Sequence, residues 1–131
     1  MGQWRAAADI PATVRGPAAA RHLVLALLDG WQLGQLSSDA QLVVSELVSN
    51  AVEHAPGTDS FKLELLWHAD RLRIALADGS SIRPVVAELD AERPRGRGMH
   101  IVAALADDWG ADEHSGGKRV WVELGATGPH R

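Results

Sequence analysis

Apolar residues recur at helical spacing in two long segments in the first half of the chain. The first segment, residues 17–33, places on one helical face the side chains of Leu23, Val24, Leu27, Leu28 and Trp31. Pro17 stands in the first turn, where a helix tolerates proline, and Gly34 ends the pattern. The spacing therefore predicts an amphipathic helix over residues 17–33.

A second helical segment begins after Ser37-Ser38-Asp39, residue types that cap helix N-termini, and stops near Ala55-Pro56-Gly57. Its predicted buried arc consists of Val43, Val44, Leu47, Val48, Ala51, Val52 and Ala55. Its predicted solvent side consists of Ser45, Ser49 and Glu53. Glu46 and Asn50 lie on the seam between the two, because a spacing of four puts both on one helical face.

Apolar and polar residues then alternate strictly, with the two-residue period that is typical of strands. Apolar residues at every second position occupy 61–67 and 72–76, joined by His68-Ala69-Asp70. This predicts an antiparallel hairpin with one buried face. Residues 109–113 and 119–124 predict a second hairpin, and the spacing over 99–105 predicts a short helix before it.

Residues 79–98 carry two prolines, several charges and few core signals, so they predict a long irregular loop, either a functional lid or a disordered segment. The expected organisation is a flexible tail over 1–16, one domain over 17–124 and a second tail over 125–131. The elements in this order predict an α+β fold with helices on one face of a mostly antiparallel sheet.

Composition changes this picture little. The chain has 131 residues, 46% hydrophobic, enough for one buried core. No apolar run reaches the roughly 20 residues of a membrane span, and the N-terminus does not resemble a signal peptide. We therefore expect a cytoplasmic protein with no membrane association. The absence of cysteine excludes disulfides and thiol chemistry.

Charge excludes one class of partner. The net charge is −4 and no basic stripe is present, so nucleic acid is not an expected ligand. Arg93, Arg95 and Arg97 alternate before the 99–105 helix. They either screen a polyphosphate or keep the loop solvated.

Three polar features carry candidate chemistry. Glu46 and Asn50 either make local hydrogen bonds at the helix edge or face a ligand, because a half-buried carboxylate needs a partner. Asp78 and Gly79 follow a predicted strand, and a strand-end carboxylate can accept a hydrogen bond from a purine amine. Gly96-Arg97-Gly98 precedes a helix N-terminus, where backbone N–H groups and the helix dipole favour phosphate. Each feature is weak by itself.

The ordered set is more specific. A helix with Glu46 and Asn50, a hairpin, a strand-end Asp78 and a glycine loop that opens a helix resemble the GHKL superfamily (gyrase, Hsp90, histidine kinase and MutL), and in particular its short bacterial anti-sigma-factor kinase branch. The Gly117-Lys118-Arg119-Val120-Trp121 segment adds to this resemblance. The resemblance covers residues 17–124 and implies the two-layer ATP-binding sandwich of that superfamily.

The resemblance also implies roles and cofactors. Glu46 is the implied base, Asn50 the implied Mg²⁺ ligand, and ATP with Mg²⁺ the implied cofactors. The residues implied to contact the nucleotide are Asn50, Asp78, Gly79, Arg95, Gly96, Arg97, Gly98 and Met99. Asn50 can act as that ligand because magnesium prefers hard oxygen ligands and keeps several waters.

Some positions depart from the family pattern. Ser80 and Ile82 replace the glycines two and four positions after the aspartate. Arg119 stands where relatives commonly carry threonine, and its side chain either points away from the nucleotide or crowds it. His54 matches a histidine of many short relatives, but its role is open.

Three functions fit the sequence. The resemblance favours an anti-sigma factor that phosphorylates an anti-anti-sigma (STAS-domain) protein on serine or threonine and sequesters a sigma factor. The alternatives are a non-catalytic docking module and a histidine-kinase-type catalytic domain. Trp31 and Leu33, at the end of the first helix, either form a surface for a homodimer or partner or belong to the core.

Overall fold

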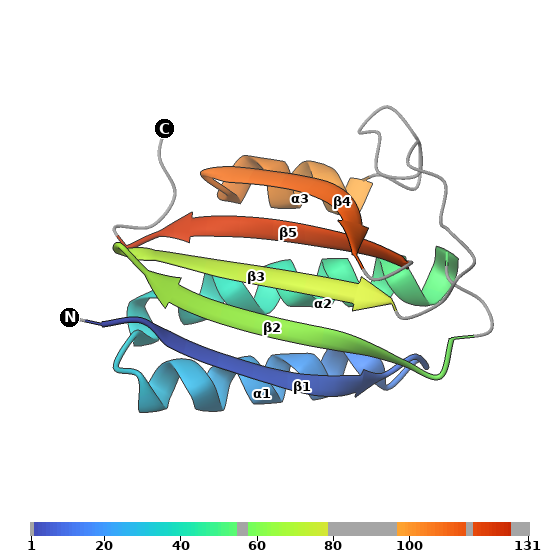
Figure 1. Ribbon diagram of the computed structural model, residues 1–131, viewed down its shortest axis with the longest axis horizontal. Coiled ribbons are helices and arrows are strands. Elements are labelled where there is room, and N and C mark those ends of the chain that lie inside the picture. The colour runs from blue at the N-terminus through green and yellow to red at the C-terminus, as the bar shows by residue number, and fades with distance from the viewer. Residues whose placement is uncertain (1, 55–57, 79–96, 115–116, 127–131) are drawn as a thin grey trace.

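A five-stranded antiparallel sheet carries all the described helices on one of its faces (Figure 1). The computed structural model describes residues 2–54, 58–78, 97–114 and 117–126. The elements are β1 (Trp4–Pro11), α1 (Gly16–Gly30), the 3₁₀ turn η1 (Gly34–Leu36), α2 (Ser37–His54), β2 (Ser60–His68), β3 (Arg71–Asp78), α3 (Arg97–Leu105), β4 (Asp108–His114) and β5 (Gly117–Gly125). The strand order is β1-β2-β3-β5-β4. The predicted α+β class, with helices layered on one face of the sheet, is confirmed.

The first predicted hairpin is confirmed as β2–β3, with one buried face. Leu65 lies opposite Ile74, and Trp67 lies opposite Leu72, on the face that the helices cover. The turn places Ala69 and Asp70 at positive φ, 55° and 63°. Two consecutive positive φ values are typical of type I′ turns, which join the strands of tight hairpins because their twist matches that of the strands.

The helices bury the faces that their spacing predicts. On α1, Ala20, Val24 and Leu28 are fully buried. On α2, the fully buried or nearly buried residues are Val43, Val44, Leu47 and Val48, while Ala51 and Val52 are partly buried against the same core. Burial of these side chains fixes the rotation of α2 about its axis.

The residues after α1 belong to the core rather than to an exposed surface. Helix α1 ends at Gly30, so Trp31 and Leu33 follow it. Leu33 is 6% exposed and lies in the core cluster. Trp31 is partly buried, and its ring centroid lies 5.8 Å from that of Trp4. The core alternative is therefore correct for Leu33.

The strand β1 was missed by the sequence analysis, which expected a flexible tail over residues 1–16. It pairs with β2 along its whole length, from Trp4 opposite Trp67 to Pro11 opposite Ser60. Its alternation is weak because three of its eight residues are alanine, which has no strand preference. Pro11 is tolerated because it ends an edge strand.

The second predicted hairpin is confirmed as β4–β5, and the short predicted helix as α3. Residues 79–96 and 127–131 lie outside the described part of the chain, so the loop and C-terminal tail expected there stay predictions. No described helix is both long and apolar enough to cross a membrane.

Candidate functional site

One end of the sheet brings together the segments that carry the candidate residues. Strand β3 ends there at Asp78, as predicted, and β5 begins there at Gly117. The register confirms that these two ends adjoin, because Ala77 pairs with Arg119. We call this end, formed by the end of β3 and the start of β5, the nucleotide end, after the ligand that the sequence resemblance implies.

The N-terminus of α3 points to the same end. Helix α3 runs into β4 through a short link in which the Asp107 N–H donates to the Glu123 carbonyl (2.9 Å). Glu123 lies near the far end of β5, where Asp108 pairs with it. Since α3 finishes at that far end, its first residues, from Arg97, lie toward the nucleotide end (Figure 1). The partial positive charge of a helix N-terminus is thus directed to this end.

The C-terminal half of α2 lies behind the nucleotide end (Figure 1). Its placement is fixed by close packing at Gly16, where an added Cβ would lie 2.4 Å from the Pro11 carbonyl oxygen and 3.0 Å from Val48 Cγ1. Glycine is required at this crossing because no side chain fits. The contact locks α1 and α2 against the end of β1.

Glu46 and Asn50 occupy the seam that the spacing predicts. Both side chains are half-buried, between fully buried Val43 and Val44 on one side and exposed Ser49 on the other. They are one helical turn apart on the half of α2 that lies behind the nucleotide end. The structure therefore offers a carboxylate and a carboxamide on one face, both partly accessible.

The Asn50 carboxamide has an unusual environment. Its Nδ2 atom is buried and has no hydrogen-bond partner in the part of the chain that the structure describes. A buried amide nitrogen without a partner costs roughly 1–3 kcal/mol. Such an atom is typical of a site that a ligand or ordered water completes, which fits a group held at this position.

Lys118 was missed by the sequence analysis as a candidate. Its side chain is only 7% exposed at the start of β5, and the β4–β5 register places it opposite Glu113. The signal was present, since position 118 continues the alternation of Val120, Val122 and Leu124 toward the helices. A buried lysine therefore lies at the start of β5, beside the end of β3.

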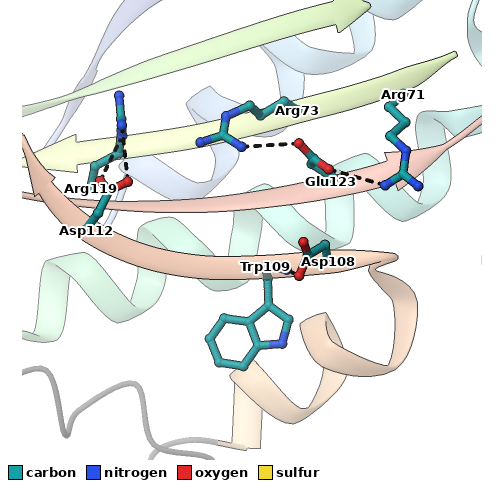
Figure 2. Close-up of polar contacts among 7 residues, drawn as sticks. All are labelled: Arg71, Arg73, Asp108, Trp109, Asp112, Arg119 and Glu123. Atoms are coloured by element: carbon teal, nitrogen blue, oxygen red, sulfur yellow. Dashed lines mark hydrogen bonds and ion pairs between the residues drawn. The ribbon is translucent and has the colours of Figure 1, made fainter. Parts of the chain in front are cut away.

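The Arg119 side chain lies on the sheet face that carries no helix. Its Nε and Nη2 donate to Asp112 Oδ1 and Oδ2, each at 3.2 Å, on the sheet face opposite the helices (Figure 2). Of the two alternatives for this departure from the family pattern, the structure supports the side chain pointing away.

His54 lies at the end of α2 with its Nε2 3.5 Å from Glu53 Oε1. The remaining predicted residues are placed only in part. Gly79, Arg95 and Gly96, like Ser80 and Ile82, lie outside the described residues, and Arg97, Gly98 and Met99 are placed as the first residues of α3. Their contacts with a nucleotide stay predictions.

Comparison with known proteins agrees with this fold. Residues 10–124 match the family model described as histidine kinase-like ATPase domain. The match begins at the end of β1 and ends within β5, so it includes strands β2 to β5 and the described helices α1, α2 and α3. No curated protein matches the chain.

Proposed function

This chain belongs to the histidine kinase-like ATPase domain family, and from that premise we propose that it is an ATP-binding regulator of the anti-sigma type. In this proposal it transfers phosphate from Mg-ATP to a serine or threonine of an anti-anti-sigma protein with a STAS domain. It also sequesters a sigma factor. The observation that carries the proposal is the half-buried pair of Glu46 and Asn50 at the nucleotide end.

ATP with Mg²⁺ supplies an activated γ-phosphoryl group and neutralises charge on the phosphates. Asn50 would offer its carboxamide oxygen to the metal, because magnesium prefers hard oxygen ligands and needs few from the protein. The buried, partnerless Nδ2 of Asn50 is consistent with a bound group that completes the site. Lys118 and the N-terminus of α3 favour the negative charge of phosphates at the same end.

Glu46 is the base of the proposed reaction. Its carboxylate accepts the proton of the substrate hydroxyl while that oxygen bonds to the γ-phosphorus and the bond to the ADP oxygen breaks. The half-buried position of Glu46 suits this role because a base in a drier site holds its acceptor oxygen in one orientation.

The test is phosphate transfer from labelled ATP to a STAS-domain protein of the same organism. Glu46→Gln keeps the size and shape of the side chain but replaces the carboxylate by an amide, which cannot act as a base. We expect transfer to fall by about 10²-fold or more, the usual contribution of a positioned base, with ATP affinity within threefold of wild type.

The matched control is Glu53→Gln, the same change on the exposed side of α2. It is expected to keep wild-type transfer. Full transfer by Glu46→Gln would contradict the assignment of the base. ATP binding by wild type without transfer to any STAS protein would instead favour the docking module.

A further inference from the structure

The sheet face that carries no helix has a hollow of about 210 Å³. Small side chains leave room for it, since Ala7 and Ala75 lie on either side of Glu64 in one row across β1, β2 and β3. The longer side chains that line the hollow on this face are Arg5, Glu64, Leu66, Arg73 and Arg119. Sites for drug-sized ligands have volumes of roughly 300–1,000 Å³. The hollow therefore fits a smaller molecule.

Two of the arginines that line the hollow are held by acids beside it. Arg73 Nη1 donates to Glu123 Oε2 at 3.2 Å (Figure 2), and the Arg73 guanidinium lies 4.4 Å from the ring centroid of Trp121. Arg119 donates to both carboxylate oxygens of Asp112. Glu123 and Asp112 are not among the described residues that line the hollow. A guanidinium has five N–H donors, and Arg73 uses one of them for Glu123, so it can also donate to a ligand.

Two opposite charges at the hollow have no such partner. Arg5 and Glu64 occupy diagonal positions on β1 and β2, because Arg5 pairs with Leu66, two residues after Glu64. Diagonal neighbours in a sheet lie roughly 7–8 Å apart, within reach of long side chains. Among the residues that the structure describes, neither side chain makes a hydrogen bond or an ion pair. The hollow thus offers one cation and one anion to a ligand.

We propose that the hollow binds a small carboxylic acid with a hydrogen-bond donor on the adjacent carbon, that is, an α-hydroxy or α-amino acid with a short apolar side chain. Arg5 and Arg73 donate to its carboxylate, and Glu64 accepts from its hydroxyl or ammonium group. Leu66 and Ala75 contact its carbon chain. Glu64 disfavours phosphate, which has no positive group to offer it, and an apolar ligand would leave both charges without a partner.

The experiment is a titration of the full chain without nucleotide, followed by NMR at the backbone N–H groups of Leu66 and Ala75. The ligands share one carbon chain: valine, its α-hydroxy analogue, isovalerate, which lacks the donor, and isobutylamine, which lacks the carboxylate. We expect valine or its hydroxy analogue to shift these signals, and the tighter of the two identifies the donor. Isovalerate and isobutylamine are expected to bind at least about tenfold more weakly, as the loss of a charged hydrogen bond implies.

Variants test the two assigned charges. Arg5→Gln and Glu64→Gln are each expected to weaken binding of the tighter acid by at least about tenfold. Arg5 is exposed and Glu64 half-buried, so the fold tolerates either change. The matched controls make the same substitutions at exposed positions of the helix layer, Arg15→Gln before α1 and Glu53→Gln on α2. Both are expected to bind like wild type.

Three results would overturn the proposal. They are the absence of a shift with both acids, binding of isovalerate or inorganic phosphate as tight as that of the tighter acid, and wild-type affinity in Arg5→Gln or Glu64→Gln. Since the titration contains no nucleotide and the hollow lies on the face opposite the helices, failure here is distinct from failure of the proposed kinase activity.

Discussion

Two polar side chains on an otherwise apolar helical arc carry the proposed chemistry. The positions of Glu46 and Asn50 could be predicted from sequence because helical periodicity fixes which face each residue of α2 takes once the buried arc is known. Strand alternation also predicts that position 118 faces the helices, but the residue there is a lysine, a type that is rarely buried, so its burial was not predicted. The direction of Arg119 required coordinates, since only the structure shows its pairing with Asp112.

At this scale the first prediction concerns Arg119. Replacement by the threonine common in relatives removes an exposed ion pair on the sheet face that carries no helix, so stability is expected to fall by no more than about 1 kcal/mol. ATP affinity is expected to equal that of wild type, because the side chain lies on the face opposite the helices. Urea denaturation and calorimetry measure the two quantities. A change in ATP affinity above threefold would place the arginine at the nucleotide.

The elements owe their positions to packing and to turns. The α2 helix and the β2–β3 hairpin could be predicted because their patterns have a strong period. The β1 strand could not, because its alanines give no contrast between its two faces, and its residues pair with β2 residues that lie 49 to 63 positions away in sequence.

The β2–β3 turn gives a prediction at this scale. Ala69 has φ of 55°, which is strained for a residue with a Cβ. Ala69→Gly is therefore expected to stabilise the fold by about 0.5–1 kcal/mol, since strain relief of about 1–2 kcal/mol exceeds the added backbone entropy. The same change in a helix interior, Ala26→Gly, is expected to destabilise by about 1 kcal/mol. Urea denaturation measures the free energy of unfolding of both variants. A change of the same sign for Ala69→Gly and Ala26→Gly would refute the turn geometry.

The contact of α1 with β1 gives a second prediction. Gly16→Ala is expected to destabilise the fold by about 1–3 kcal/mol. The Cβ of the alanine would overlap the Pro11 carbonyl oxygen, so the backbone of α1 or of β1 would have to shift. At Gly30, the last residue of α1, nothing lies within 4 Å of an added Cβ. Gly30→Ala is expected to be neutral or stabilising. A neutral Gly16→Ala in urea denaturation would contradict the packing of α1 on β1.

Across the whole molecule, the layered fold separates two surfaces. The helices cover one face of the sheet, the end of β3 and the start of β5 form the nucleotide end, and the other face of the sheet carries no helix (Figure 1). The layer order could be predicted from the sequence of elements. The rows of side chains that cross the sheet could not, because alternation within a strand does not reveal which residues align across five strands.

The most direct test of a Mg-ATP site at the nucleotide end is calorimetric titration of ATP into wild type and Asn50→Ala, with and without Mg²⁺. The matched control is Gln41→Ala, which removes a carboxamide from the same helix, where Gln41 Nε2 donates to Ser37 Oγ. We predict Mg²⁺-dependent binding by wild type and by Gln41→Ala, and binding at least about tenfold weaker for Asn50→Ala. Absence of ATP binding by wild type, or equal affinity of Asn50→Ala with Mg²⁺, would contradict the account.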